Sequence, residues 1–332
     1  MKKISIIIPN YNGDKFIRSC LDSVSNQDYP NKEVIVVDDG STDDSVKIVR
    51  QFMKENKKLD MKLICQDNLN AAVARNNGMK KATGDLVVFL DSDDLLRANV
   101  VSKLIAKYEK NDADLLIGGY EEISEGGEHL KDKNFSDVII AINPRKEFSE
   151  LANMDPVPSN KIYNLKLIRK NNLQWGNVRI GQDLNFYLKY LAICKKVLLT
   201  SEIVYRYRIV QGSMSRTYNS KIFDIVKVFP DVEDFYVKTN NEALYKQYIP
   251  VLMVKHFNFQ LYKQVFYTDL KTRKKIVNYF REAERRVDYT SCVDKLQLSK
   301  ILIKFRLKCI FRIFYTSSWY CHYKLWRIKH GK

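Results

Sequence analysis

Short runs of apolar residues alternate with more polar segments of helical length over the first 120 residues of the chain. The runs ISIIIP and EVIVVDD are apolar at consecutive positions, which is typical of parallel strands buried on both faces. We predict strands at residues 4–9, 33–39, 63–67, 85–91 and 112–120, and helices at 14–26, 41–56 and 71–82. This order predicts an α/β fold with a mostly parallel sheet flanked by helices.

The pattern changes in the second half of the chain. Residues 145–210 follow no single period, although the sequence near Gly181 has the form of a loop that enters a helix. Beyond about residue 215, Tyr, Phe and Lys recur in segments of helical length. We therefore predict two domains, an α/β domain at 1–215 and a helical, basic, aromatic-rich C-terminal region at 216–332.

The chain carries 56 Lys and Arg against 39 Asp and Glu, a formal net charge of +17. Such an excess favours a polyanionic partner, which is nucleic acid, anionic lipid or a phosphorylated substrate. The six cysteines form no CxxC pair and show no Cys/His ligand spacing, so neither a disulfide framework nor a zinc site is expected. No window of about 18 apolar residues predicts a transmembrane helix. The apolar start, MKKISIIIPN, is too short for a signal peptide.

Three carboxylates occur within four positions directly after a predicted strand, in the stretch VVFLDSDDLL at 87–96. Ionised carboxylates this close repel one another, and their burial without a counter-charge is unfavourable. A turn followed by a helix N-cap would account for one or two of them. A divalent cation would account for all three, because Mg²⁺ and Mn²⁺ prefer carboxylate and phosphate oxygens. The residues alone leave both interpretations open.

Four segments occur in a defined order along the chain: SIIIPNYNG, EVIVVDDGSTDDS, ARNNG and GDLVVFLDSDD. In this order and at these spacings the chain resembles the family-2 glycosyltransferases of the GT-A fold, over roughly residues 3–210. The resemblance implies a Rossmann-like GT-A domain that is followed by the C-terminal helical region. It also implies an inverting transfer from a nucleotide-sugar, expected to be a UDP-sugar, with Mn²⁺ or Mg²⁺ as the cofactor.

The resemblance assigns roles to residues at the ends of the first two predicted strands. It places Pro9, Tyr11 and Asn12 around the nucleotide, with Tyr11 against the uracil, and makes Asp39 an acceptor from the base. The alternative for Tyr11 and Asn12 is that they are turn residues beside Gly13. The alternative for Asp39 is that it caps the following helix.

The remaining donor-side residues belong to the DxD motif and to ARNNG. The resemblance brings Asp91 to the ribose and the metal, makes Asp93 the direct metal ligand, and places Ser92 between them. Arg75 would organise the pocket near the diphosphate. The alternative for Arg75 is a surface ion pair, which would contribute little to stability.

Asp183, in the segment IGQDLNF, matches the family position of the base that deprotonates the acceptor hydroxyl. Gln182 stands where related chains usually carry Glu, and the loss of this charge should lower the pKa of Asp183. The alternative is that Asp183 only caps a helix. A second departure is Asn70, where Gly is common, and Asn tolerates a left-handed backbone.

Two further segments match the family less specifically. KIY at 161–163 resembles a segment on the acceptor side. Arg206, Arg208 and residues 213–215 correspond to a loop that closes over the diphosphate, and a solvated surface is the alternative for them.

The last 38 residues, 295–332, contain ten Lys or Arg and no acidic residue. Lys300, Lys304, Lys308 and Arg312 recur every four positions and form one stripe of a helix whose other face is mainly apolar. A basic amphipathic helix of this kind suits an anionic membrane surface. The alternative is a helix that packs on the first domain with solvated lysines. We do not expect nucleic-acid binding, because no reading module is recognisable.

These observations predict a bacterial-type, metal-dependent glycosyltransferase that is cytoplasmic and peripheral on the inner face of the membrane. We expect a lipid-linked oligosaccharide acceptor, in the synthesis of a capsule, O-antigen or similar polymer. Processive synthases of the family that this chain resembles carry a QxxRW motif and membrane spans, and neither is found in this sequence, so the resemblance implies one sugar per encounter. The alternatives are a sugar-nucleotide pyrophosphorylase, for which PNYNGDK is a poor phosphate loop, a catalytically degenerate transferase, and a membrane-surface binding protein.

Overall fold

The computed structural model describes residues 1–133, 140–210, 220–265 and 270–288. The chain forms two compact units, Met1–Glu242 and Ala243–Lys332. The first unit thus extends past residue 215, where we predicted a domain boundary, and includes the helix α8 (Ile225–Lys238).

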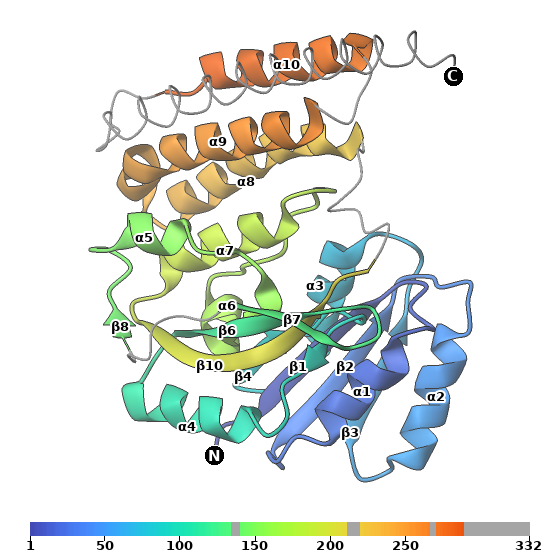
Figure 1. Cartoon of the computed structure of the whole chain (residues 1–332). Helices are drawn as coiled ribbons and strands as arrows, with labels where there is room; N and C mark the ends of the chain where they lie inside the picture. Colours follow the sequence, from blue (N-terminus) through green and yellow to red (C-terminus); the bar gives the residue numbers. More distant parts are fainter. Residues whose placement is uncertain (134–139, 211–219, 266–269, 289–332) are drawn as a thin grey trace, which may run out of the picture. The chain divides into compact units, whose positions relative to one another are not determined.

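A ten-stranded sheet forms the centre of the first unit, in the order β3-β2-β1-β4-β9-β6-β10-β5, with β7 on β6 and β8 on β10 (Figure 1). Five strands lie close to their predicted positions: β1 (Ile4–Asn10), β2 (Lys32–Asp38), β3 (Asp60–Cys65), β4 (Leu86–Phe89) and β6 (Leu115–Ile123). The other five were not predicted: β5 (Leu95–Leu96), β7 (His129–Lys133), β8 (Ile140–Ile142), β9 (Lys161–Asn164) and β10 (Val197–Arg208).

The sheet is parallel in its N-terminal half and mixed beyond it. Strand β1 pairs in parallel with β2 and β4, and β2 pairs in parallel with β3. Strand β9 is inserted antiparallel between β4 and β6, with Tyr163 opposite both Val87 and Leu115. The α/β class is confirmed, but the expectation of a mostly parallel sheet holds only for the first half. The reason is that β9 and β5 contribute short antiparallel pairings, which need no helical crossover.

Helices cover both faces of this sheet (Figure 1). Ile4, Ile6 and Ile8 of β1 join a core cluster with the helices of one face, α1 (Ile17–Ser25), α2 (Ser45–Glu55) and α4 (Val101–Asn111). Ile7 points to the opposite face, because successive side chains of a strand alternate. There it meets α3 (Ala71–Lys81) so closely that a Cβ on Gly78 would lie 2.5 Å from Ile7 Cγ2.

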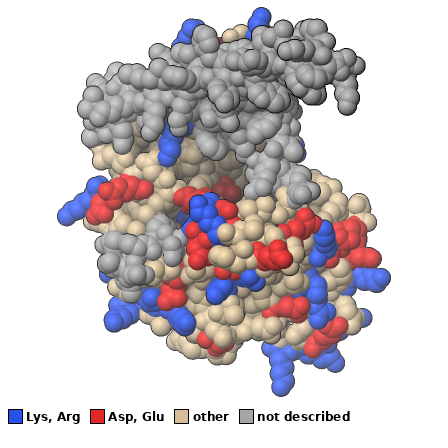
Figure 2. Space-filling view, in the orientation of Figure 1, with Lys and Arg blue, Asp and Glu red and all other residues tan. Residues whose placement is uncertain are grey.

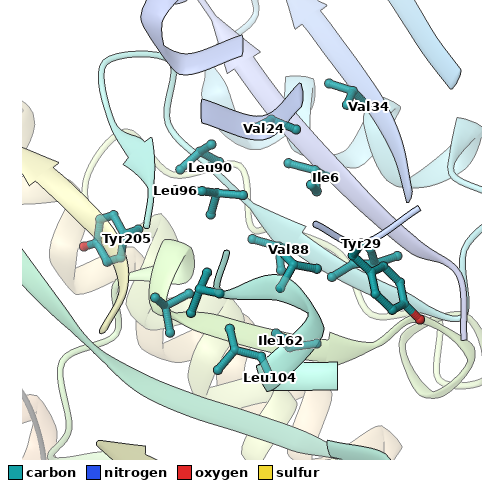
Figure 3. Close-up of a cluster of buried hydrophobic side chains, with 14 of the residues drawn as sticks. Ile6, Val24, Tyr29, Val34, Val88, Leu90, Leu96, Leu104, Ile162 and Tyr205 are labelled. Carbon is teal, nitrogen blue, oxygen red and sulfur yellow. The ribbon is translucent and has the colours of Figure 1, made fainter. Parts of the chain in front are cut away.

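The core cluster is built from apolar side chains of both layers. Figure 3 shows Ile6, Val34 and Val88 of the strands beside Val24 of α1 and Leu104 of α4. These side chains are at most 4% exposed, and each buried side chain of this size contributes about 1.5–3 kcal/mol to folding. Strands β1, β2 and β4 are therefore fixed in place by burial, whereas β3 is only partly buried.

The opposite face is completed by aromatic side chains and by the short helices α5 (Phe148–Ala152) and α6 (Leu165–Lys170) and the longer α7 (Gln182–Ile193). Phe89 of β4 contacts Trp175 and Phe186 edge to face, at centroid distances of 4.9 and 5.5 Å. Trp175 stacks on Phe186 at 4.3 Å. This packing fixes the start of α7 against the carboxyl end of β4. Short 3₁₀ turns precede β9 and α8, at Pro158–Asn160 and Ser220–Asp224.

The second unit consists, over its described residues, of α9 (Glu242–Val265) and α10 (Leu270–Arg285). Phe257 of α9 and Phe280 of α10 pack with their ring centroids 6.0 Å apart. No helix among the described residues is long and apolar enough to cross a bilayer. The predicted basic amphipathic helix at 295–332 lies outside the described residues.

Candidate functional site

The loops that follow β1 and β2 are joined by side-chain hydrogen bonds. Asn10 Nδ2 and Ser41 Oγ both donate to Asp38 Oδ1, at 2.9 and 2.6 Å. The Asn12 backbone N–H donates to Ser41 Oγ at 2.9 Å, and the Thr42 N–H donates to Asn12 Oδ1 at 2.8 Å. The two loops are therefore held together at the carboxyl ends of the parallel strands, where α/β proteins bind their ligands.

Three predicted nucleotide-site residues lie at this edge. Pro9 is buried within β1, opposite Val37 of β2, so it packs beneath the loop that follows β1 and does not face solvent. Asn12 has a left-handed backbone with φ of 48°, as a turn residue would. Tyr11 is 50% exposed, which is unusual for a large ring, and this leaves a face that can stack on a planar ligand.

Asp39 is 4% exposed, and its carboxylate binds the loop before α3. Oδ1 accepts from Gln66 Nε2 at 2.7 Å and from the Leu69 N–H at 2.9 Å, and Oδ2 accepts from the Asn70 N–H at 2.8 Å. The alternative that Asp39 caps the following helix does not fit, because Asp44 is the N-cap of α2. Asp39 thus fixes the loop after β3 against the end of β2.

Asn70 has a backbone role and a capping role. Its φ of 101° lies in the region that favours glycine, and its side chain accepts from the N–H groups of Ala72 and Val73 at the start of α3. A glycine would supply the backbone conformation but not the cap. The turn forms with Asn at this position, but its ψ of 163° lies outside the left-handed helical region that we expected Asn to occupy.

Arg75 joins the end of β4 to the start of α7. It projects from α3 and is 5% exposed, so it is not the surface ion pair that we considered. Its Nη2 donates to Asp91 Oδ1 at 2.6 Å, and its Nη1 lies 3.7 Å from Asp183 Oδ1. Nη1 also donates to Gln182 Oε1 at 3.4 Å. The guanidinium lies 4.5 Å from the centroid of the Trp175 ring, which fixes its plane.

The three carboxylates after β4 differ in environment. Asp94 is 1% exposed and accepts from the Arg208 N–H at 2.8 Å, which ties β10 to the motif. Asp91 is paired with Arg75, whereas no hydrogen bond to the Asp93 carboxylate comes from another described side chain. Desolvation, and then the charge of Asp91, raise the pKa of Asp93 to about 6. Asp91 and Asp93 are therefore the carboxylates available to a cation, with Ser92 between them near Gly13.

Asp183 lies in the first turn of α7 but does not cap it. The N-cap is Gly181, with a φ of 83° that suits glycine. Desolvation by the surrounding protein raises the pKa of Asp183 to about 6, and Asp91 acts in the same direction. Arg75 and Lys161 act in the opposite direction. A carboxyl group with this pKa is mostly ionised at neutral pH and can accept a proton.

Sequence reasoning missed or underrated two residues of the site. Trp175 orients Arg75, and no motif marks it. Lys161 is completely buried, and its ammonium donates to the carbonyl groups of Asp155 and Val157, each at 2.7 Å. Burial lowers the pKa of Lys161 to about 7. Its segment KIY was the only sequence signal, and the structure places it in β9 between β4 and β6.

The diphosphate-side segment is partly described. Arg208 Nε donates to the Asp93 backbone carbonyl at 2.9 Å, so this arginine does lie beside the DxD motif. Arg206 instead pairs with Glu121, on the adjacent strand β6. Residues 213–215 lie outside the described residues.

A second group of metal-ligand type lies on β6 and β7. Ligand atoms of Glu121, His129 and Asp132 lie within 4.8 Å of one another. Glu121 already forms ion pairs with Arg97 and Arg206, which neutralise its charge. This group is therefore less suited to a cation than Asp91 and Asp93, where only one carboxylate has a partner.

The α/β fold, with carboxylates directly after β2 and β4, is of the class that includes the GT-A transferases. The model of "Glycosyl transferase family 2" matches residues 5–174, more than half of the chain. The chain belongs to this family.

Relatives and solved structures agree with the family. Glycosyltransferase GlyG of Streptococcus pneumoniae is 29% identical over 306 residues, which is 85% of this chain and 97% of that protein. Glycosyltransferase GlyA of the same organism is 31% identical over 229 residues, 66% of this chain, and the chain spans only 32% of its length. The structure of S. aureus TarS 1–349 in complex with UDP-GlcNAc superposes with a TM-score of 0.70 at 24% identity, covering 91% of this chain and 88% of that one. This likeness shows the fold, and the predicted GT-A class is confirmed.

Proposed function

We propose that the protein transfers a sugar from a UDP-sugar to a hydroxyl group of a lipid-linked oligosaccharide acceptor, in the synthesis of a bacterial surface polysaccharide. The observation that carries this proposal is the position of Arg75, which holds Asp91 of the DxD motif and Asp183 of α7 in one cluster. The choice of UDP is supported by TarS, which was solved with UDP-GlcNAc.

The donor's nucleotide would lie at the ends of β1 and β2. In this proposal Tyr11 stacks on the uracil, and Pro9 and Asn12 shape the edge beside it. Asp39 already accepts from three protein donors, so a bond to the base would use its remaining acceptor capacity. The hydrogen-bonded loops pre-organise this edge, which reduces the entropy lost on binding.

Asp91 and Asp93 fit a divalent cation. Their oxygen atoms are hard ligands, and desolvation together with the charge of Asp91 raises the pKa of Asp93, which a bound cation would offset. Bound Mn²⁺ or Mg²⁺ would neutralise the charge that develops on the departing diphosphate. Arg75 holds the Asp91 carboxylate in position for this role through the hydrogen bond from its Nη2.

Asp183 would act as the catalytic base in a single displacement. Its carboxylate takes the proton of the acceptor hydroxyl, and the oxygen of that hydroxyl attacks the anomeric carbon. The bond between the anomeric carbon and the diphosphate oxygen breaks as the new glycosidic bond forms, so the configuration inverts and UDP leaves. Arg75, at 3.7 Å, favours the ionised form of Asp183 before the proton is taken.

The test is UDP release from a panel of UDP-sugars by the purified protein, with and without Mn²⁺. We expect metal-dependent release from one donor, and loss of that release in Asp183→Asn while UDP binding is retained. If UDP does not bind in the presence of Mn²⁺ by calorimetry, the proposal is wrong. If Asp183→Asn releases UDP as fast as the wild type, the assignment of the base is wrong.

We also propose that the catalytic domain predicted at 1–215 continues through α8, and that the remainder of the region predicted at 216–332 associates peripherally with the inner face of the cytoplasmic membrane. The described part of this region supports the proposal, because Lys271, Lys274 and Arg281 of α10 are exposed. Each basic residue near an anionic headgroup layer contributes about 1 kcal/mol to binding.

A further inference from the structure

A cavity of about 1080 Å³ lies in the first unit between α6, α7 and α8. Its lining includes Leu167 and Lys170 of α6, Lys189 of α7, and Phe235 and Lys238 of α8. The volume is at the upper end of the range for small-molecule sites, so it can hold several sugar units. None of the predicted donor-site residues belongs to its lining.

A second hollow of about 580 Å³ adjoins this cavity, because Gln174, Lys189 and Asp231 line both. Its lining includes Asn177 and Val178. Both residues form hydrogen bonds with neighbours of the candidate site: Asn70 Nδ2 donates to Asn177 Oδ1 at 2.9 Å, and Gln182 Nε2 donates to the Val178 carbonyl at 2.7 Å. The second hollow therefore lies between the larger cavity and residues that are hydrogen-bonded to the start of α7.

The cavity is predominantly cationic. It is lined by five cations, Arg145, Lys170, Lys189, Lys195 and Lys238, and by two carboxylates, Asp231 and Asp234. Lys189 is 5% exposed and pairs with Asp231 at 2.5 Å, so one carboxylate is already neutralised. Among the described residues, no carboxylate pairs with Lys170, Lys195 or Lys238.

The lining also offers groups that suit carbohydrate. The amide side chains of the exposed residues Asn172, Gln174 and Asn240 line the cavity, and no described residue forms a hydrogen bond with them, so they are accessible to a ligand. Such amides donate to and accept from sugar hydroxyl groups. The ring of Phe235 supplies an apolar surface in the same wall. A wall with cations, unpartnered amides and an aromatic ring fits an anionic carbohydrate better than a neutral or an apolar ligand.

We propose that this cavity binds the phosphate- or carboxylate-bearing part of the acceptor glycan, several sugar units from the hydroxyl that reacts. The inference rests on the proposed function and names the class of acceptor, an anionic oligosaccharide. Val178, which lines the second hollow, accepts a hydrogen bond from Gln182, the neighbour of Asp183 at the start of α7. Binding of remote substrate segments is a means by which enzymes position the reacting group.

The test compares three hexamers by calorimetry on the full chain, with saturating UDP and Mn²⁺ so that the donor site is filled: hexagalacturonate, a synthetic glycerol phosphate hexamer and maltohexaose. We expect one or both anionic hexamers to bind and the neutral one to bind at least about tenfold more weakly. The two anionic probes distinguish a carboxylate-bearing from a phosphate-bearing acceptor. Equal binding of maltohexaose would overturn the proposal.

A charge-reversal variant locates the binding. Lys170→Glu, Lys195→Glu and Lys238→Glu together should weaken the anionic hexamer at least about tenfold, because each reversed contact costs a few-fold in affinity. The matched control reverses three exposed lysines of and beside α2, at positions 54, 57 and 58. This control changes the net charge by the same amount as the cavity variant and leaves the ten cations of 295–332 in place, so it should bind the anionic hexamer as the wild type does.

Two readouts separate this inference from the proposed function. UDP binding and UDP release from the donor should stay unchanged in both triple variants, since neither touches the donor site. Equal weakening in the cavity variant and in the control would overturn the cavity as the site. If the wild type itself does not bind UDP in the presence of Mn²⁺, the proposed function is overturned instead.

Discussion

Replacement of Arg75 by Met tests whether Asp183 acts as a base whose ionisation Arg75 controls. Only the ionised carboxylate accepts a proton, so activity should be complete above the pKa of about 6 and fall as the pH drops through it. Arg75 favours the ionised form and lowers this pKa. Its removal therefore raises the pKa and moves the acid limb of the pH profile to higher pH.

The size of the shift follows from the distance of 3.7 Å between Arg75 Nη1 and Asp183 Oδ1. Two unit charges about 4 Å apart interact by about 4 kcal/mol at an effective dielectric constant near 20, which corresponds to about three pH units as an upper limit. The Asp183 side chain is 42% exposed, and solvent screens the interaction. We expect the acid limb to move by about one pH unit.

The assay is kcat/KM for UDP release as a function of pH between 5 and 9, in Arg75→Met, Arg75→Lys and the wild type. Arg75→Lys retains the charge, so its acid limb should stay close to that of the wild type, even though a lysine cannot reproduce the separate contacts of Nη1 and Nη2. Thermal denaturation checks that the variants are folded. An acid limb at the same pH in Arg75→Met and the wild type would refute the coupling between the two residues.

Three further predictions concern the metal site, the core and the C-terminal region. Asp93→Ala should abolish Mn²⁺-dependent UDP binding in calorimetry, and full binding would place the cation elsewhere. Gly78→Ala should lower the free energy of unfolding by about 1–3 kcal/mol in denaturant titrations, because the new Cβ would lie 2.5 Å from Ile7 Cγ2. Gly126→Ala, whose Cβ would meet only Ser124 Oγ at 3.8 Å, is the control, and equal losses in both would contradict the packing argument. Deletion of residues 296–332 should release the protein from anionic liposomes in sedimentation assays while donor binding is retained, and unchanged sedimentation would disprove the membrane role of the tail.

The sequence predicts the first half of the sheet well because consecutive residues of those strands are buried and therefore apolar. Strands β1, β2 and β4 lie between two layers of helices, so each is an uninterrupted apolar run that the sequence displays directly. Strand β9 has only four residues and begins with the buried Lys161. Strand β10 carries charged residues among its apolar ones. Their places in the sheet depend on partners far away in the chain, which local patterns do not encode.

The candidate site likewise contains residues that local motifs reveal and residues that only long-range contacts reveal. The resemblance to family 2 indicated Asp39, Arg75, Asp91 and Asp183, since these residues belong to motifs with fixed spacing. The residues that orient them could not be predicted, because they act through long-range contacts. Trp175 lies a hundred positions from Arg75 in the sequence, and its role depends on the stacking of its ring against Phe186.

Gln182 illustrates how a departure from a family pattern can be explained by hydrogen bonding. Its Oε1 accepts from Arg75 Nη1 at 3.4 Å, and its Nε2 donates to the Val178 carbonyl at 2.7 Å. A glutamate could accept from Arg75 but could not donate to Val178, because an ionised carboxylate has no proton to give. It would also place a second negative charge beside Asp183.

Gln182→Glu should therefore raise the pKa of Asp183 and move the acid limb of kcat/KM to higher pH, because a neighbouring negative charge disfavours ionisation. The lost hydrogen bond to Val178 should also lower the free energy of unfolding by about 1 kcal/mol, since it leaves that carbonyl without its donor. Gln182→Met removes the same hydrogen bond without adding a charge, so it should lower the stability and leave the acid limb in place. If both variants move the acid limb equally, the shift comes from disturbed geometry rather than from charge, and the amide at this position has no electrostatic role in tuning the base.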